Sequence, residues 1–147
     1  MFEESAKQGD YLRIKTGSYN RPITCANKQA QEWFNRGCAW AANFHREEAS
    51  YCFTKVTEVD PACAMGYWGI ALSNGPDYNF HEKAGFYGMA GQESGYPSLK
   101  VATEAIMQGK KVASAPVELA LLEALSVRYE CACASLRCLI PLPLHHA

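Results

Sequence analysis

The feature that most constrains this fold is an early series of aromatic and small residues at helical spacing. Trp33, Gly37 and Trp40 follow one another at steps of three and four, so they share one face of a helix. Ala49 and Phe53, a small and a large residue four apart, form the complementary face of a second helix. A glycine lets the second helix approach closely. The pattern therefore predicts two helices packed against each other.

The same pattern begins again further along the chain. Tyr67 follows Trp33 at the same interval at which Ala71 follows Gly37. Pro61 stands between the two units, where a proline ends one helical unit or starts the next. The interval matches the tetratricopeptide repeat, in which pairs of helices recur with a period of about 34 residues. We therefore predict an all-α fold of tetratricopeptide-like helix-turn-helix repeats, an α-solenoid of about five helices.

These units divide the chain into three parts. Residues 1–27 form an entry segment with an extended stretch near Pro22, and residues 131–147 form a poorly ordered tail. Between them, Asn27 is expected to cap the first helix and Asn43 to end it in the left-handed conformation. The predicted helices span residues 28–42, 46–59, 63–72, 98–113 and 116–129. The repeat domain, 28–130, comprises repeat one at 28–61, repeat two at 62–115 with an inserted loop at 75–97, and the first helix of repeat three at 116–130.

Composition and charge narrow the class of protein. Hydrophobic residues make up 48% and charged residues 20%, as in globular proteins, and the net charge of -1 favours neither a nucleic-acid nor a membrane partner. No apolar run approaches the ~20 residues that span a bilayer, and the sequence from Met1 to Glu4 is unlike a signal peptide. The seven cysteines are odd in number, so we expect reduced thiols in a cytoplasmic protein.

Seven short stretches within residues 16–130 form a series of motifs that is specific to one family: 17–23, 30–37, 47–49, 60–61, 63–72, 75–79 and 118–129. This series resembles the N-terminal part of an uncharacterised tetratricopeptide-repeat family of fungi and bacteria. The family usually has histidine where this chain has Arg46 and asparagine where it has Asp77. Its members continue for several more repeats, whereas an unrelated tail follows Glu130 here. We therefore expect a truncated or alternatively spliced product, or an error in the gene model.

Tetratricopeptide repeats usually bind peptides along a concave face made by the first helix of each repeat. Here that face would present a partner-binding groove of Gln31, Phe34, Asn35, Cys38, Met65, Trp68 and Leu72. A clamp for carboxylate tails needs lysine and asparagine where this chain has Phe34 and Cys38, so that use is excluded. The alternative is that Phe34 and Trp68 are buried core residues. We predict a scaffold or adaptor module for a protein or peptide partner, or for self-association, without catalytic activity, metal or cofactor.

A second hypothesis is a ligand- or metal-binding, even enzymatic, site at the loop 75–82. The candidate side chains are His45, Asp77, Tyr78, Asn79 and His81. The alternative is a helix cap followed by a solvated turn.

The remaining sequence patterns give weaker indications of function. The tail holds soft metal ligands at Cys131, Cys133, Cys138, His145 and His146, but their spacing matches no zinc signature. The sequence has no phosphate-binding loop, no H-E-x-x-H and no G-x-S-x-G motif. Three glutamates, Glu118, Glu123 and Glu130, are expected on a charged, solvent-facing side of the last helix.

Overall fold

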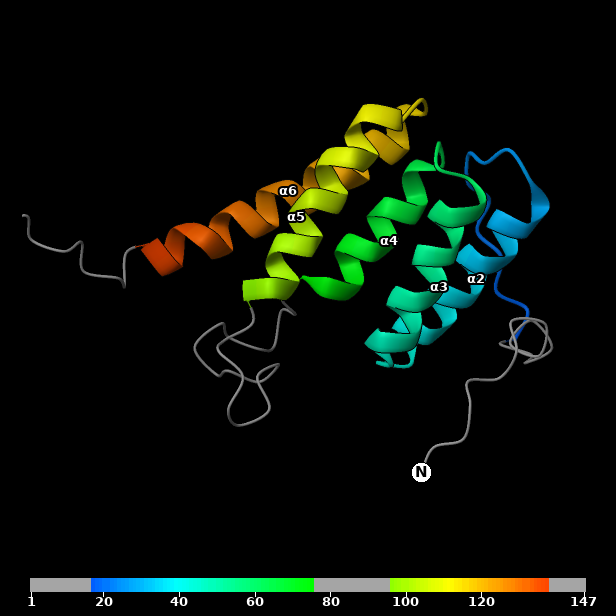
Figure 1. Ribbon diagram of the computed structural model, residues 1–147, viewed down its shortest axis with the longest axis horizontal. Helices are drawn as coiled ribbons and strands as arrows, with labels where there is room; N and C mark the ends of the chain where they lie inside the picture. Colours follow the sequence, from blue (N-terminus) through cyan, green and yellow to red (C-terminus); the bar gives the residue numbers. More distant parts are fainter. Residues whose placement is uncertain (1–16, 76–95, 138–147) are drawn as a thin grey trace, which may run out of the picture.

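The computed structural model describes residues 17–75 and 96–137, and this part of the chain is helical, with no β-strand. Its helices are α2 (Lys28–Ala42), α3 (Arg46–Val59), α4 (Ala64–Asn74), α5 (Tyr96–Val112) and α6 (Pro116–Arg137). Each of them packs against the next helix of the series, and α4 also contacts α2 and α6. In Figure 1 they form a stack with α2 and α3 towards one end and α5 and α6 towards the other.

The first two helices begin and end where the sequence predicts. Asn27 caps α2, because its side-chain oxygen accepts a hydrogen bond of 2.9 Å from the backbone N–H of Ala30. Glu47 and Glu48 lie in the first turn of α3, where the helix dipole favours negative charge. Further on, α4 begins one residue later and ends two residues later than predicted, while α5 begins two residues earlier.

The turn between α2 and α3 differs from its prediction. Asn43 keeps a negative φ of -92°, and its side-chain nitrogen donates to the carbonyl oxygen of Ala39 at 2.8 Å, so it continues the last turn of α2. The left-handed conformation falls on Phe44, with a φ of 62°. Phe44 is 82% exposed and therefore does not extend the apolar stripe of α2.

The predicted end of the last helix, at residue 129, was wrong. α6 continues through Arg137, and in Figure 1 its red end reaches beyond the first turn of α5. The segment from Cys131 to Arg137 contains two alanines and neither glycine nor proline, so nothing in it interrupts a helix. Residues 138–147 lie outside the described part of the chain.

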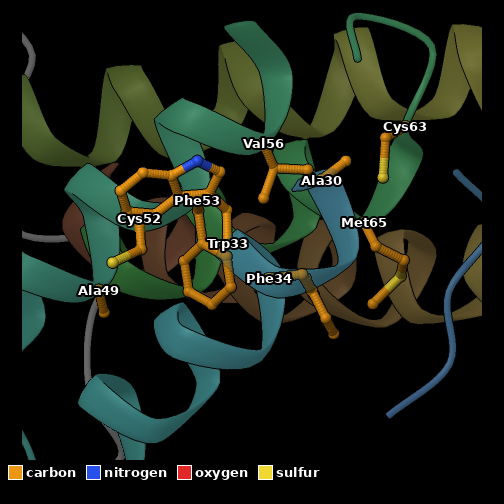
Figure 2. Packing of buried hydrophobic residues seen from close by; sticks show 9 residues of the cluster. All are labelled: Ala30, Trp33, Phe34, Ala49, Cys52, Phe53, Val56, Cys63 and Met65. Atoms are coloured by element: carbon orange, nitrogen blue, oxygen red, sulfur yellow. The ribbon is translucent and has the colours of Figure 1, made fainter. Parts of the chain in front are cut away.

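Two hydrophobic clusters hold the stack together. The first joins α2, α3 and α4, and its fully buried aromatic residues are Trp33, Phe34 and Phe53 (Figure 2). Gly37 and Gly69 both lie against the Phe53 ring, and a Cβ atom at Gly37 would lie 2.6 Å from the ring. The second cluster joins α4, α5 and α6 and consists of Ala71, Ala102, Ala105, Ile106, Leu125 and Tyr129.

The C-terminal end of α4 is fixed by two side chains from other elements. The guanidinium of Arg46 donates to the carbonyl oxygens of Ser73 at 2.9 Å and Leu72 at 3.2 Å, and also to that of Gly75. These carbonyls lack partners within the helix, and a cation is favourable beside them. From the other side, the ring of Tyr129 packs so closely on Gly75 that a Cβ atom there would overlap it.

In the described part of the chain, no helix is both long enough and apolar enough to cross a bilayer.

Candidate interaction surface

Residues 20–26 of the entry segment lie along α2 in an extended arrangement that belongs to no β-sheet; this segment is called the strand below. Their side chains alternate, because Arg21, Ile23 and Cys25 are half-buried while the residues between them are exposed. Ile23 and Cys25 pack against the first hydrophobic cluster. An alternation of period two is typical of an extended backbone that lies with one side on a surface. The segment therefore occupies a surface that would otherwise be open.

Two amide side chains of α2 bind the backbone of this segment. The Gln31 side-chain oxygen accepts from the N–H of Ile23 at 3.0 Å, while its nitrogen donates to the carbonyl oxygen of Arg21 at 2.8 Å. Asn35 accepts from the N–H of Arg21 at 3.2 Å and donates to the side chain of Asn20 at 2.9 Å. Gln31 also donates to Asn35 at 3.0 Å, which fixes the orientation of both amides. Helix α2 thus recognises main-chain groups of an extended strand.

Two buried carboxylates bind the remainder of the segment. Glu118, in the first turn of α6, accepts from the N–H of Thr24 at 2.7 Å and is only 5% exposed. Asp60, at the end of α3, accepts from the N–H of Ala26 at 2.5 Å and is 6% exposed. Buried carboxylates are stabilised by such charge-assisted hydrogen bonds. The segment is therefore attached to α2, to the residue that ends α3 and, far away in the sequence, to α6.

A thiol lies beside these carboxylates. Burial, followed by the negative charge of Asp60, raises the pKa of Cys25 above its usual value, and Glu118 adds to this effect. The Cys25 thiol donates to the carbonyl oxygen of Asn27 at 3.4 Å. A raised pKa lowers the fraction of thiolate, and the Cys25 side chain packs against the first hydrophobic cluster.

The structure separates the predicted groove residues into two groups. Phe34 and Met65 lie inside the first cluster with less than 2% exposure, so they are core residues and do not line an open groove. Gln31 and Asn35 face the entry segment. The other three, Cys38, Trp68 and Leu72, are half-buried against the two clusters. Binding of a partner by the groove residues stays a prediction.

Of the side chains predicted for the ligand site, the described residues contain only His45. It precedes α3, its ring centroid lies 5.4 Å from that of Trp40, and its Nδ1 atom lies 3.9 Å from a carboxylate oxygen of Glu47. The described residues contain no group of three metal-ligating side chains that could hold an ion. The other candidates, Asp77, Tyr78, Asn79 and His81, lie outside the described residues, so this site stays a prediction.

Sequence reasoning missed the two carboxylates. Glu118 was expected to face solvent, and that prediction was wrong; Glu123 is exposed as expected. The spacing contained a signal, because Glu118 shares a helical stripe with Leu122, Leu125 and Tyr129, all of which are buried. Comparisons with protein-family models, with curated proteins and with solved structures found no match to this chain.

Proposed function

We propose that this chain is a protein-interaction module of tetratricopeptide-like repeats that binds an extended stretch of polypeptide. The observation that carries the proposal is the binding of residues 20–26 by side chains that contact main-chain groups. A surface that binds one extended strand through its backbone has the chemistry to bind another of similar shape. The chain's own strand then acts as an internal competitor.

The packing order supports the repeat assignment. Helices α2 and α3 form one pair, and α4 and α5 form the next at the interval that separates Trp33 from Tyr67. The first helix of each pair contacts the first helix of the next unit, so that α2 contacts α4 and α4 contacts α6. In this proposal the partner is a protein segment in an extended conformation, with small apolar side chains at alternate positions like those of Ile23 and Cys25. Because the site binds main-chain groups, its affinity should depend little on the partner's other side chains.

A displacement experiment tests the proposal. Ile23→Ser in the full chain removes an apolar anchor of the internal strand and leaves the four helix-borne acceptors in place. A labelled peptide of residues 18–27 is then added in trans, and binding is followed by fluorescence anisotropy. We expect the Ile23→Ser protein to bind the peptide more tightly than the unchanged protein does, because internal competition is weaker.

Two glutamines of α2 provide a matched control. Gln31→Ala removes two contacts to the strand, whereas Gln29→Ala changes an exposed residue of the same helix that makes none of them. In the Ile23→Ser background, only Gln31→Ala is expected to weaken peptide binding. If the folded Ile23→Ser protein fails to bind the peptide, or if both alanine variants behave alike, the proposal is wrong.

A further inference from the structure

Helix α6 carries an apolar stripe on the side that faces away from the stack. Val117 and Val127 are 63% and 60% exposed, and Ala120 and Ala124 between them are exposed as well. The steps of three, four and three residues are those of the a and d positions of a heptad. The opposite face of the same helix is buried in the second cluster, so the stripe is a separate surface.

The stripe distinguishes α6 from the first two helices. The exposed positions of α2 are Lys28, Gln29, Glu32 and Ala42, and those of α3 are Glu47, Tyr51, Thr54 and Glu58. Those faces are mostly polar, as expected for helices in contact with water. On α6, by contrast, four apolar residues recur in one heptad register over three turns.

Charged side chains on the two flanks of the stripe indicate what covers it. In the heptad that puts Ala124 at a, Glu123 is a g residue and Arg128 is the following e residue; both are exposed. The guanidinium of Arg128 lies 5.9 Å from the ring centroid of Tyr129 and stays at the surface. In a parallel pair of helices, a g residue faces the e residue five positions later in the partner. Glu123 of each copy would then face Arg128 of the other.

We propose that α6 pairs in parallel with α6 of a second copy of this chain, through the stripe from Val117 to Val127. An antiparallel pair would bring the two Glu123 side chains to the same flank, where like charges repel. In a two-fold symmetric dimer the pair between Glu123 and Arg128 forms twice, once on each flank. The alanines at 120 and 124 permit close approach but bury little area, so the dimer is weak and forms at high protein concentration. This surface is separate from the strand-binding residues of α2, so the inference does not depend on the proposed function.

The first experiment measures association by sedimentation equilibrium of the full chain over a concentration series. We expect the weight-average mass to rise towards twice that of the chain. Ala124→Glu places a charge in the middle of the stripe and should raise the dissociation constant at least tenfold. The control is Val101→Glu, which puts the same charge at an exposed apolar position of α5 and should leave association unchanged. A wild-type chain that stays monomeric throughout, or equal effects of the two variants, overturns the proposal.

The second experiment tests orientation by charge reversal. Glu123→Arg and Arg128→Glu each place like charges on both flanks, so each variant alone should associate about tenfold more weakly. An equimolar mixture of the two should associate again, because each flank then faces its opposite charge, and the double variant should also recover. Circular dichroism confirms that the variants are folded. If the mixture remains as weak as the single variants, parallel pairing through α6 is wrong.

Discussion

The hydroxyl of Tyr129 donates a buried hydrogen bond of 2.9 Å to the carbonyl oxygen of Ala71, joining the last described helix to α4. The same oxygen also accepts from the N–H of Gly75 at 2.9 Å, so it keeps one partner when the hydroxyl is removed. Tyr129→Phe is therefore expected to lower the free energy of unfolding by only about 1 kcal/mol. Urea denaturation measures this.

Tyr67→Phe is the matched control for that change. The Tyr67 hydroxyl donates to the carbonyl oxygen of Pro61 at 3.1 Å in an exposed position, where water can replace it. Its loss should therefore cost less than the loss of the Tyr129 hydroxyl. Equal costs for the two variants would mean that burial of the Tyr129 bond contributes nothing.

The close contact between Gly69 and Phe53 leads to a second prediction. A Cβ atom at Gly69 would overlap the Phe53 ring, so Gly69→Ala should destabilise the fold by about 1–3 kcal/mol. Alanine is otherwise favoured over glycine in a helix, so a net loss can come only from the overlap. Denaturation of Gly69→Ala in the wild-type and Phe53→Leu backgrounds forms a double-mutant cycle. We expect the penalty to shrink with leucine at position 53, and an unchanged penalty would contradict the overlap.

The carboxylate of Glu118 gives a third prediction. Glu118→Ala removes the acceptor for the Thr24 N–H, and we expect a loss of about 1–3 kcal/mol together with faster hydrogen exchange at that amide. Glu118→Gln keeps an acceptor oxygen and should stay within about 1 kcal/mol of wild type. The control is Glu123→Ala on the exposed face of the same helix, measured at a low concentration at which the chain is monomeric, where about 0.5 kcal/mol or less is expected. Unchanged exchange at Thr24 in Glu118→Ala would show that the bond does not hold the strand.

Three further thiols have pKa values raised by burial, and these set a fourth prediction. The pKa is about 11 for Cys38, about 12 for Cys52 and about 11 for Cys63, against 9.0 for an unperturbed thiol. Above pH ~9 the unfolded chain loses thiol protons that the folded chain still holds, so stability is complete below that pH and falls as the pH rises towards 11–12. Denaturation at a series of alkaline pH values measures the decline.

Cys52→Ala provides the control for the thiol prediction. It removes the thiol with the highest of these pKa values, so the alkaline decline should be shallower than in the wild type. The variant should also be less stable at neutral pH, because the Cys52 side chain is fully buried. A free energy of unfolding that does not change between pH ~8 and ~11 would contradict the assigned burial of these groups.

Local sequence signals predicted the helical fold well. The Asn27 cap and the spacing of Trp33 and Gly37 place α2 correctly, because capping and periodicity act within a few residues. The length of α6 was underestimated, since a helix continues until something interrupts it, and the first proline after Tyr129 is Pro141.

The strand-binding surface was only half predictable. Gln31 and Asn35 were predicted to line a partner-binding groove on the first helix, but their contacts with the entry segment depend on how separate parts of the chain meet. Asp60 and Glu118 bind the same entry segment only after the helices have packed together. No local pattern distinguishes a carboxylate that faces water from one that accepts a distant backbone N–H. The helical stripe that Glu118 shares with Leu122 is the nearest substitute.

The bond between Thr24 and Glu118 spans 94 residues and joins the entry segment to the last described helix. A stack whose helices contact only near neighbours can fray from either end, and its stability approximates a sum of local terms. Here the strand along α2 connects the first helix of the stack directly to the last, so losing either end weakens the other. Unfolding should therefore resemble the single all-or-none transition of a globular domain more closely than the stepwise fraying of a linear array.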